Sequence, residues 1–265
     1  MPIHCPIITN RISQEQFKLL SSEVMDHVFA IHNDFGRFFD EIVYKKELAD
    51  RMSGVLLELE IIVTHGTFSK TYYVDVLINS SGLFEFKAAD AIHSRHRGQT
   101  LNYLLLLDLA HGKVINMRPE SVGHEFVNCP ARLVDLKKPR IYDTKWSCEV
   151  AGAEALRDTL MPLIADWGAG LETGLYEEAI THFLGGEDNV LMPVPVIGPK
   201  GHLADQRMRL LAPEVAFKVT ALQDRLDDFE RQAIRLLRHT NLNAIQWINI
   251  TQTSVRFTTV HELTS

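Results

Sequence analysis

The chain has 265 residues, of which 46% are hydrophobic and 23% charged, and its formal net charge is −7 at pH 7. This composition is that of a globular protein with room for one large domain or two small ones, and it argues against intrinsic disorder. The negative charge argues against a broad basic surface for nucleic acid, so a polyanionic substrate would need local positive charge or a bound divalent metal.

Apolar spacing and β-propensity predict the same order of elements twice along the chain. The elements expected in the first half are helices 13–33 and 38–52, strands 55–65, 71–79 and 82–88, helix 94–109 and strand 112–117. The elements expected in the second half are helices 149–167 and 171–184, strands 189–197, 202–211 and 214–220, helix 224–239 and strand 243–250. This order is typical of an α/β fold with a mixed sheet covered by helices. Prolines and charges between Asn128 and Thr144 predict a linker.

The two halves also share residues at a nearly constant spacing. Tyr44 and Tyr176 are 132 residues apart, and Phe86-Lys87 and Phe217-Lys218 are 131 apart. Further pairs at similar spacing are Gly36 with Gly168, Gln99 with Gln232, and Asn116 with Asn249. Such self-similarity indicates an internal repeat. We therefore expect two domains of the same fold, 1–130 and 145–265, arranged as an internal pseudo-dimer.

Two carboxylates and a lysine in the first half are candidates for an active site. Asp75 lies in one predicted strand, and Glu85-Phe86-Lys87 in the next. Alternation along a strand places Glu85 and Lys87 on one face, and a hairpin can bring Asp75 alongside them. Paired carboxylates repel unless a cation or a proton neutralises them, and their oxygens suit Mg²⁺ or Mn²⁺. Lys87 would then orient an attacking water or stabilise a developing oxyanion.

These residues resemble the PD-(D/E)XK nuclease motif, with Val74 where the family's variable proline often stands. Two flanking patterns add to the resemblance. They are Gly36 with Glu41 and Tyr44, similar to the helical signature of the GxxExxY proteins, and Gln99 with Tyr103, similar to the Q-x-x-x-Y helix of exonuclease-like branches. The resemblance implies a restriction-endonuclease-like mixed sheet flanked by helices, present twice.

The resemblance also implies roles for individual residues. Mg²⁺ or Mn²⁺ would be held by Asp75, Glu85 and Glu41. Lys87 would be the catalytic base or charge stabiliser. The residues that would border the site are Gln99 and Tyr103. Asp40 adjoins Glu41, and only one of two successive helix positions can face the site well.

The second half lacks most of these residues. Ala216 stands in place of Glu85, and Leu236 in place of Tyr103, whereas Lys218 and an acid, Asp205, remain. Without the central carboxylate, the oxygen ligands are too few for a good Mg²⁺ site. We therefore expect residues 145–265 to be a degenerate repeat with a structural or recognition role.

Two hypotheses for the function follow. The first is a metal-dependent nuclease that hydrolyses DNA or RNA with the N-terminal domain, in which Arg95, His96 and Arg97 at the start of a helix hold phosphate. For that basic stretch, a solvated surface is the alternative. The second hypothesis is a non-catalytic module that binds nucleic acid or protein on a nuclease-like fold.

The sequence also bears on location and assembly. Residues 1–10 lack a basic stretch followed by an apolar one, and the apolar run Leu101–Ala110 is too short to span a bilayer. We therefore expect a cytoplasmic protein without a membrane partner. For assembly, a homo-oligomer is a further hypothesis beside the internal pseudo-dimer.

Overall fold

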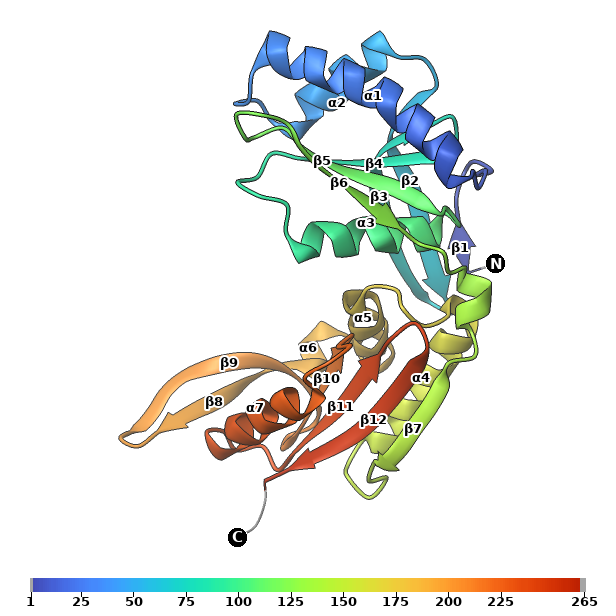
Figure 1. Cartoon of the computed structure of the whole chain (residues 1–265). Helices are drawn as coiled ribbons and strands as arrows, with labels where there is room; N and C mark the ends of the chain where they lie inside the picture. Colours follow the sequence, from blue (N-terminus) through green and yellow to red (C-terminus); the bar gives the residue numbers. More distant parts are fainter. Residues whose placement is uncertain (1, 263–265) are drawn as a thin grey trace. The chain divides into compact units, whose positions relative to one another are not determined.

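The computed structural model describes residues 2–262 and separates into unit 1, Met1–Leu133, and unit 2, Val134–Ser265 (Figure 1). Each unit is built on a mixed six-stranded sheet flanked by helices. The predicted fold class, a restriction-endonuclease-like α/β fold present twice, is confirmed. Among residues 2–262, none of the helices has the length and apolar character of a membrane-spanning segment.

Unit 1 carries its strands in the spatial order β1-β2-β3-β4-β5-β6. Its elements are β1 (Ile3–His4), α1 (Gln14–Phe35), α2 (Glu41–Arg51), β2 (Val55–His65), β3 (Phe68–Ile78), β4 (Gly82–Lys87), α3 (Ser94–Leu106), β5 (His111–Asn116) and β6 (Gly123–Asn128). β4 and β5 are parallel, and the other neighbours are antiparallel. Side chains of α1 and α2 form the main core with Phe84 and Phe86 of β4, so Glu85 and Lys87 face the side of α3.

Unit 2 carries its strands in the order β7-β12-β11-β10-β9-β8. A 3-10 turn, η1 (Leu133–Leu136), lies where unit 2 begins. Its elements are β7 (Arg140–Lys145), α4 (Ala153–Trp167), α5 (Thr173–Phe183), α6 (Glu187–Val190), β8 (Leu191–Gly198), β9 (Gly201–Ala212), β10 (Val215–Thr220), α7 (Leu226–Arg238), β11 (Ala244–Ile250) and β12 (Ser254–His261). One core cluster joins α7 to Ala216 of β10 and Trp247 of β11.

The two units share five strands in the same order and with the same pairing sense. β2 to β6 correspond to β8 to β12, and the parallel pair is β4 with β5 in one unit and β10 with β11 in the other. Phe86-Lys87 and Phe217-Lys218 occupy the equivalent strands β4 and β10.

The prediction that residues 128–144 form a linker is wrong for residues 140–144. Arg140–Lys145 forms the edge strand β7, which pairs with β12. Five of its six side chains are exposed, so the strand lacks the apolar alternation that marks a half-buried strand. The predicted elements also omit β6 and β12, the strands that follow β5 and β11.

Residues that recur between the halves hold the first two helices together. α1 ends at Gly36, with φ of 71°, and α4 ends at Gly168, with φ of 81°. Both values lie in the left-handed region that glycine adopts without steric cost. The hydroxyl of Tyr44 donates to the Gly36 carbonyl at 3.0 Å, and that of Tyr176 donates to the Gly168 carbonyl at 2.7 Å. The recurring glycine and tyrosine therefore make the same structural bond in both units.

A second recurring residue clamps the chain after β4 and β10. The Asn116 side chain accepts from the Ala89 amide at 3.1 Å and donates to the Ala89 carbonyl at 2.7 Å. The Asn249 side chain makes the same two bonds with Leu222, at 2.7 and 2.9 Å. Each asparagine thereby satisfies backbone groups that have left the sheet before the next helix begins.

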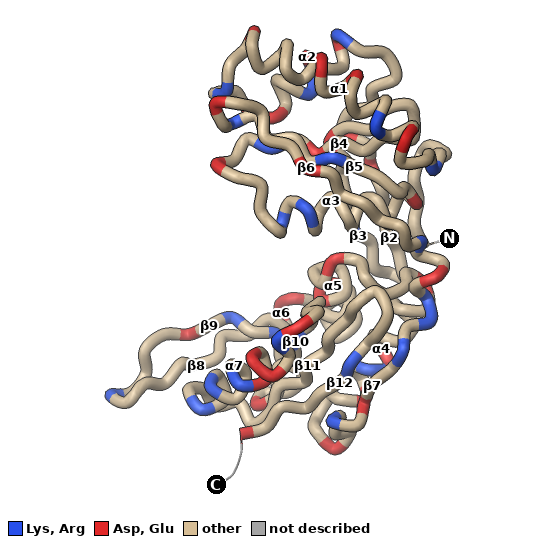
Figure 2. Tube along the Cα trace, viewed as in Figure 1, with Lys and Arg blue, Asp and Glu red and all other residues tan. Residues whose placement is uncertain are grey.

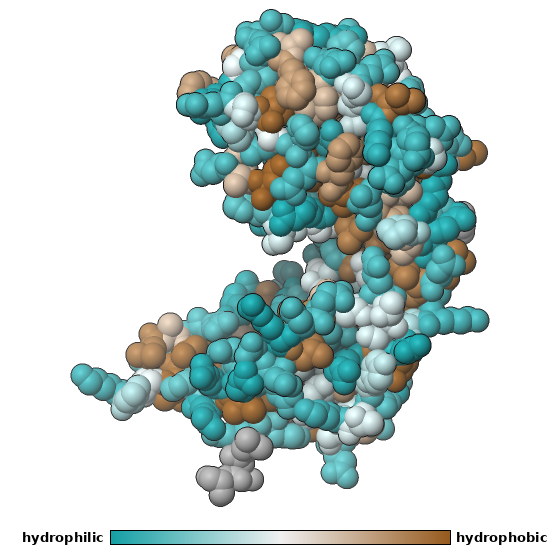
Figure 3. Space-filling view, in the orientation of Figure 1, coloured by the Kyte–Doolittle hydropathy of each residue, from teal (hydrophilic) through white to brown (hydrophobic). Residues whose placement is uncertain are grey.

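The hairpin of β8 and β9 forms one edge of unit 2 and exposes apolar side chains. Met192, Ile197 and Leu203 are exposed, and brown side chains are visible over this hairpin in Figure 3. β8 also contains Pro193 and Pro195, which lie opposite Arg207 and Asp205 of β9. Proline cannot donate to a sheet, so both positions mark an edge strand.

Removal of either asparagine clamp should destabilise the protein. We expect Asn116→Ala to lower the free energy of unfolding by about 1–2 kcal/mol, because two backbone groups lose their partner in a partly buried place. The matched variant Asn249→Ala should lower it by a similar amount. Urea denaturation followed by circular dichroism measures both effects. A loss in neither variant would show that water replaces the side chain at no cost.

Candidate active site

The candidate site lies where β3 and β4 run side by side. Val76 pairs with Phe84 in the antiparallel register, which places Asp75 next to Glu85. One oxygen of Asp75 accepts from the Phe86 amide at 3.0 Å. Lys87 Nζ lies 2.7 Å from a Glu85 oxygen and 3.8 Å from an Asp75 oxygen. The structure thus brings together the two acids and the lysine that the sequence predicts.

Glu85 is fully buried, with 0% of its surface exposed. Its Oε1 accepts from Lys87, whereas its Oε2 is buried without a hydrogen-bond partner. Burial and the neighbouring charge of Asp75 raise the pKa of Glu85 to about 8, although Lys87 acts in the opposite direction. Without a further cation, this carboxyl group therefore holds a proton at neutral pH.

Lys45 of α2 belongs to the same cluster and was not predicted from the sequence. Its Nζ donates to Asp75 Oδ1 at 2.8 Å and also to Glu58. Burial disfavours the charge on Lys45, but the bonds to Asp75 and Glu58 outweigh it and raise the pKa of the ammonium group. The sequence could have indicated this role, because Lys45 follows Glu41 by four residues and therefore shares its face of the helix.

Glu58 adopts a backbone conformation that is rare in a strand. Its φ is 50°, in the left-handed region, whereas its neighbours Leu57 and Leu59 pair normally with β3. Such a conformation is costly for a residue with a side chain and persists where its surroundings enforce it. Here it stands opposite Asp75 and contacts Lys45.

Glu41, the predicted third metal ligand, forms a hydrogen bond with the backbone in this structure. It is the first residue of α2, and its Oε1 accepts from the Ala88 amide at 2.8 Å, just beyond the end of β4. Within residues 2–262, no three His, Cys, Asp or Glu side chains form a group that could hold a metal ion. The Ala88 amide occupies one oxygen of Glu41, Asp75 and Glu85 lie side by side on the sheet, and the role of Glu41 as a third ligand stays a prediction.

The helix α3 contributes Gln99 and Tyr103. Gln99 Nε2 donates to the Tyr103 hydroxyl at 3.1 Å, and the Tyr103 ring packs edge-on against Tyr72 of β3, with the ring centroids 6.2 Å apart. The predicted pair is thus joined, and it is anchored to the strand that carries Asp75. His96 lies one turn earlier, and burial followed by the charge of Lys87 lowers its pKa.

The basic stretch at the start of α3 is partly neutralised. Figure 2 shows cationic positions at this end of the helix. Arg95 is exposed, whereas Arg97 forms an ion pair with Glu125 of β6 at 2.9 Å. Of the three predicted phosphate contacts, Arg97 is therefore paired with an acid, and His96 Nδ1 accepts from the His93 amide at 3.2 Å.

In unit 2 the equivalent place holds one carboxylate and two cations. Glu177, which follows Tyr176 as Lys45 follows Tyr44, accepts from Lys218 Nζ at 2.8 Å and from Arg209 at 3.4 Å. It also accepts from the Val219 amide at 3.1 Å, the bond that Glu41 makes with Ala88 in unit 1. The spacing of 132 residues pairs Glu41 with Thr173, so the comparison of the two halves missed Glu177, which lies four residues further along.

Asp205, the acid retained in the second half of the sequence, lies away from this cluster. It pairs with Pro195 in the β8–β9 hairpin and bonds to His202 at 2.8 Å. Ala216 instead stands opposite Leu210, because a bulge shifts the register of β9 against β10. The aligned acid is therefore not the structural equivalent of Asp75.

The residues in unit 1 fit a divalent cation of the magnesium type. Two adjacent carboxylates, one with a buried oxygen that lacks a partner, are an incomplete set of hard oxygen ligands. Mg²⁺ is commonly held by one or two carboxylates and keeps several waters. A cation beside Glu85 would supply the missing partner and remove the need for a proton.

Comparison with known proteins points to the same region. Residues 18–127 match the sequence model of the PD-(D/E)XK nuclease superfamily, whose nucleases typically use divalent metals. No curated protein matches the chain. The solved structure of SSO0001 is similar over 44% of this chain and 60% of its own length, with 18% sequence identity and a TM-score of 0.28.

The raised pKa of Glu85 predicts how stability depends on pH in the absence of metal. An acid whose pKa rises from 4.5 to about 8 on folding contributes stability below pH 4.5 and loses it as the pH rises through 8. We expect Glu85→Gln, which cannot ionise, to unfold at a higher temperature than the wild type at pH 8 in EDTA, with a smaller difference at pH 5.

Differential scanning calorimetry measures this effect, and the exposed Glu120→Gln is the matched control. The control should follow the wild type at both pH values. If Glu85→Gln also followed the wild type, Glu85 would not carry a buried proton.

Proposed function

We propose that unit 1 is a metal-dependent nuclease that hydrolyses phosphodiester bonds of DNA or RNA. The observation that carries the proposal is the buried Glu85 oxygen without a partner, next to Asp75 and Lys87. A buried carboxyl oxygen without a hydrogen-bond partner costs stability, and such costs are typical of functional sites. The superfamily match over residues 18–127 supports the same function.

Asp75 and Glu85 are the proposed ligands of Mg²⁺ or Mn²⁺. A cation bound there would lower the pKa of a coordinated water and offset charge on the scissile phosphate. Lys45 holds Asp75 in place, since it donates to the oxygen that does not bond to the Phe86 amide. Glu41 acts as a positioning residue, because it fixes the Ala88 amide directly after Lys87.

Lys87 is the proposed catalytic lysine. Its ammonium lies within 4 Å of both carboxylates and is held by burial as well as by charge. Burial disfavours its charge, but Glu85, Asp75 and Glu41 outweigh it and raise the pKa of Lys87. A lysine that stays protonated is suited to stabilise the phosphoryl oxyanion rather than to accept a proton.

The face of α3 would border the substrate. Gln99 and Tyr103 shape the wall of the site, and Arg95 provides positive charge where the helix begins, with His96 beside it as a neutral hydrogen-bonding group. Unit 2 lacks the carboxylate pair, and we assign it a recognition or structural role.

The alternative function is a non-catalytic module that binds nucleic acid or protein. The observation that favours it is the pairing of each carboxylate with a lysine, Asp75 with Lys45 and Glu85 with Lys87. These contacts hold both acids in place without a metal. Cleavage and metal binding therefore decide between the two functions.

Loss of Lys87 should reduce cleavage but retain metal binding. We expect Lys87→Ala to cut labelled single- and double-stranded DNA and RNA about 100-fold more slowly than the wild type in Mg²⁺ or Mn²⁺, because one preorganised charge is lost. Lys218→Ala is the matched control, since this lysine pairs with Glu177 in unit 2 and Ala216 stands there in place of Glu85. Equal loss in both variants would assign catalysis to unit 2 as well, and no cleavage by the wild type would favour the alternative.

Metal binding should release protons. Because Glu85 must ionise to become a ligand, we expect about one proton to be released per metal at pH 7, and affinity to rise about tenfold per pH unit between pH 6 and 8. Titration calorimetry in two buffers of different ionisation enthalpy measures the proton count. Unchanged metal binding in Glu85→Gln would remove Glu85 from the ligands.

A further inference from the structure

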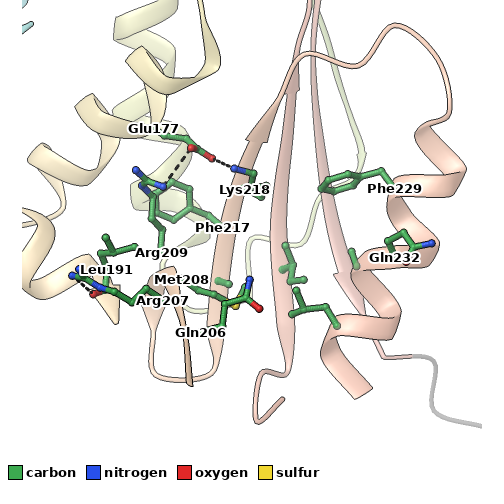
Figure 4. A pocket seen from close by; sticks show the side chains of 14 residues that line it. Glu177, Leu191, Gln206, Arg207, Met208, Arg209, Phe217, Lys218, Phe229 and Gln232 are labelled. Atoms are coloured by element: carbon green, nitrogen blue, oxygen red, sulfur yellow. Dashed lines mark hydrogen bonds and ion pairs between the residues drawn. The ribbon is translucent and has the colours of Figure 1, made fainter. Parts of the chain in front are cut away.

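A pocket of about 340 Å³ lies in unit 2 at the place that corresponds to the candidate active site of unit 1. It is bounded by β9 and β10 on one side and α7 on the other (Figure 4). Its volume is at the lower end of the range for small-molecule sites. Neither the proposed cleavage in unit 1 nor the superfamily match gives this pocket a role.

Substitutions at equivalent positions explain why the space is open. In unit 1 the equivalent positions carry Glu85 of β4 and Tyr103 of α3, and both side chains are buried. In unit 2 the corresponding residues, Ala216 and Leu236, are shorter, and both line the pocket. The loss of the carboxylate and of the phenol ring therefore exchanges a filled polar site for a cavity.

One end of the pocket is cationic. Arg207, Arg209 and Lys218 line it, against a single acid, Glu177. Glu177 is buried and holds Lys218 and Arg209 in fixed positions, as the dashed lines in Figure 4 show. The bonds from Arg209 to Glu177 and Thr181 use only part of its five N–H donors. Lys218 and Arg209, which are held by one acid, suit a phosphate anion, whereas Arg207 donates to the Leu191 carbonyl at 3.4 Å.

The other end is apolar and aromatic. Phe229 lines it from α7, and its ring lies against Trp247 with centroids 4.4 Å apart, which fixes the ring. Phe229 occupies the position of His96 in unit 1, one turn before Gln232, the counterpart of Gln99. Figure 4 shows Phe229 and Gln232 on the side opposite Glu177 and Lys218. An aromatic ring with a nearby amide can stack on a flat heterocycle and bond to its edge.

We propose that this pocket binds a single nucleotide without metal, with the phosphate at Lys218 and Arg209 and the base at Phe229 and Gln232. The ligand class is a nucleoside monophosphate or one unpaired nucleotide of a strand. Lys218, which pairs with Glu177 in place of a neighbouring acid on β10, then has a role in binding the ligand. This binding is independent of the cleavage proposed for unit 1.

The test is titration calorimetry of the full chain with each of the four ribonucleoside monophosphates, in EDTA and at low salt. Inorganic phosphate and adenosine are the separate halves of the ligand. We expect saturable binding of at least one monophosphate, and binding at least tenfold weaker for phosphate and for adenosine alone. Because the measurement needs neither metal nor cleavage, its failure is distinct from a failure of the nuclease proposal.

Substitutions of residues that line the pocket test where the ligand binds. Phe229→Ala and Lys218→Ala should each weaken binding about tenfold, and Leu236→Tyr should abolish it by restoring the side chain that fills unit 1. Arg235→Ala removes a charge from α7 outside the pocket and should bind as the wild type does. Circular dichroism confirms that each variant is folded.

Three results would overturn the proposal. The first is no saturable binding of any monophosphate at millimolar concentration. The second is binding of inorganic phosphate as tight as that of the nucleotides, which would leave an anion site alone. The third is binding that is lost in Lys87→Ala and kept in Lys218→Ala, which would place the nucleotide in unit 1.

Discussion

A charge that is buried where the second helix meets the sheet must be compensated, and both units are arranged around this requirement. In unit 1 the buried acids Asp75 and Glu85 are held by Lys45 and Lys87. In unit 2 the helix residue that corresponds to Lys45 is an acid, Glu177. It is held by cations from β9 and β10. Removal of one partner from a buried pair leaves an unpaired charge, so such sites change by coordinated substitutions.

The residues shared by the halves therefore fall into two classes. Gly36 with Tyr44 and Gly168 with Tyr176 make the same bond between the first two helices in each unit. The positions that differ lie instead on the face toward the third helix, where Glu85 is exchanged for Ala216. The glycine and tyrosine of the helical signature are thus structural in both units, whatever chemistry each unit performs.

Apolar periodicity was sufficient to predict the paired helices and the central strands, because burial selects those side chains directly. It did not predict β7, whose six residues are largely exposed. Nor did it predict the roles of Lys45, Glu58 and Glu177. Their contacts depend on a left-handed residue in β2 and on how the second helix meets the sheet, and both are set by tertiary packing rather than by local sequence.

The two prolines of β8 have a consequence for assembly. Residues two apart in a strand point their backbone groups to the same side, so Pro193 and Pro195 leave the outer edge without two N–H donors while the pairing with β9 is kept. An edge strand with exposed apolar side chains would otherwise recruit strands from other molecules. The hairpin can therefore keep its exposed apolar side chains without a liability to edge-to-edge aggregation, and any partner of this edge must bind through side chains.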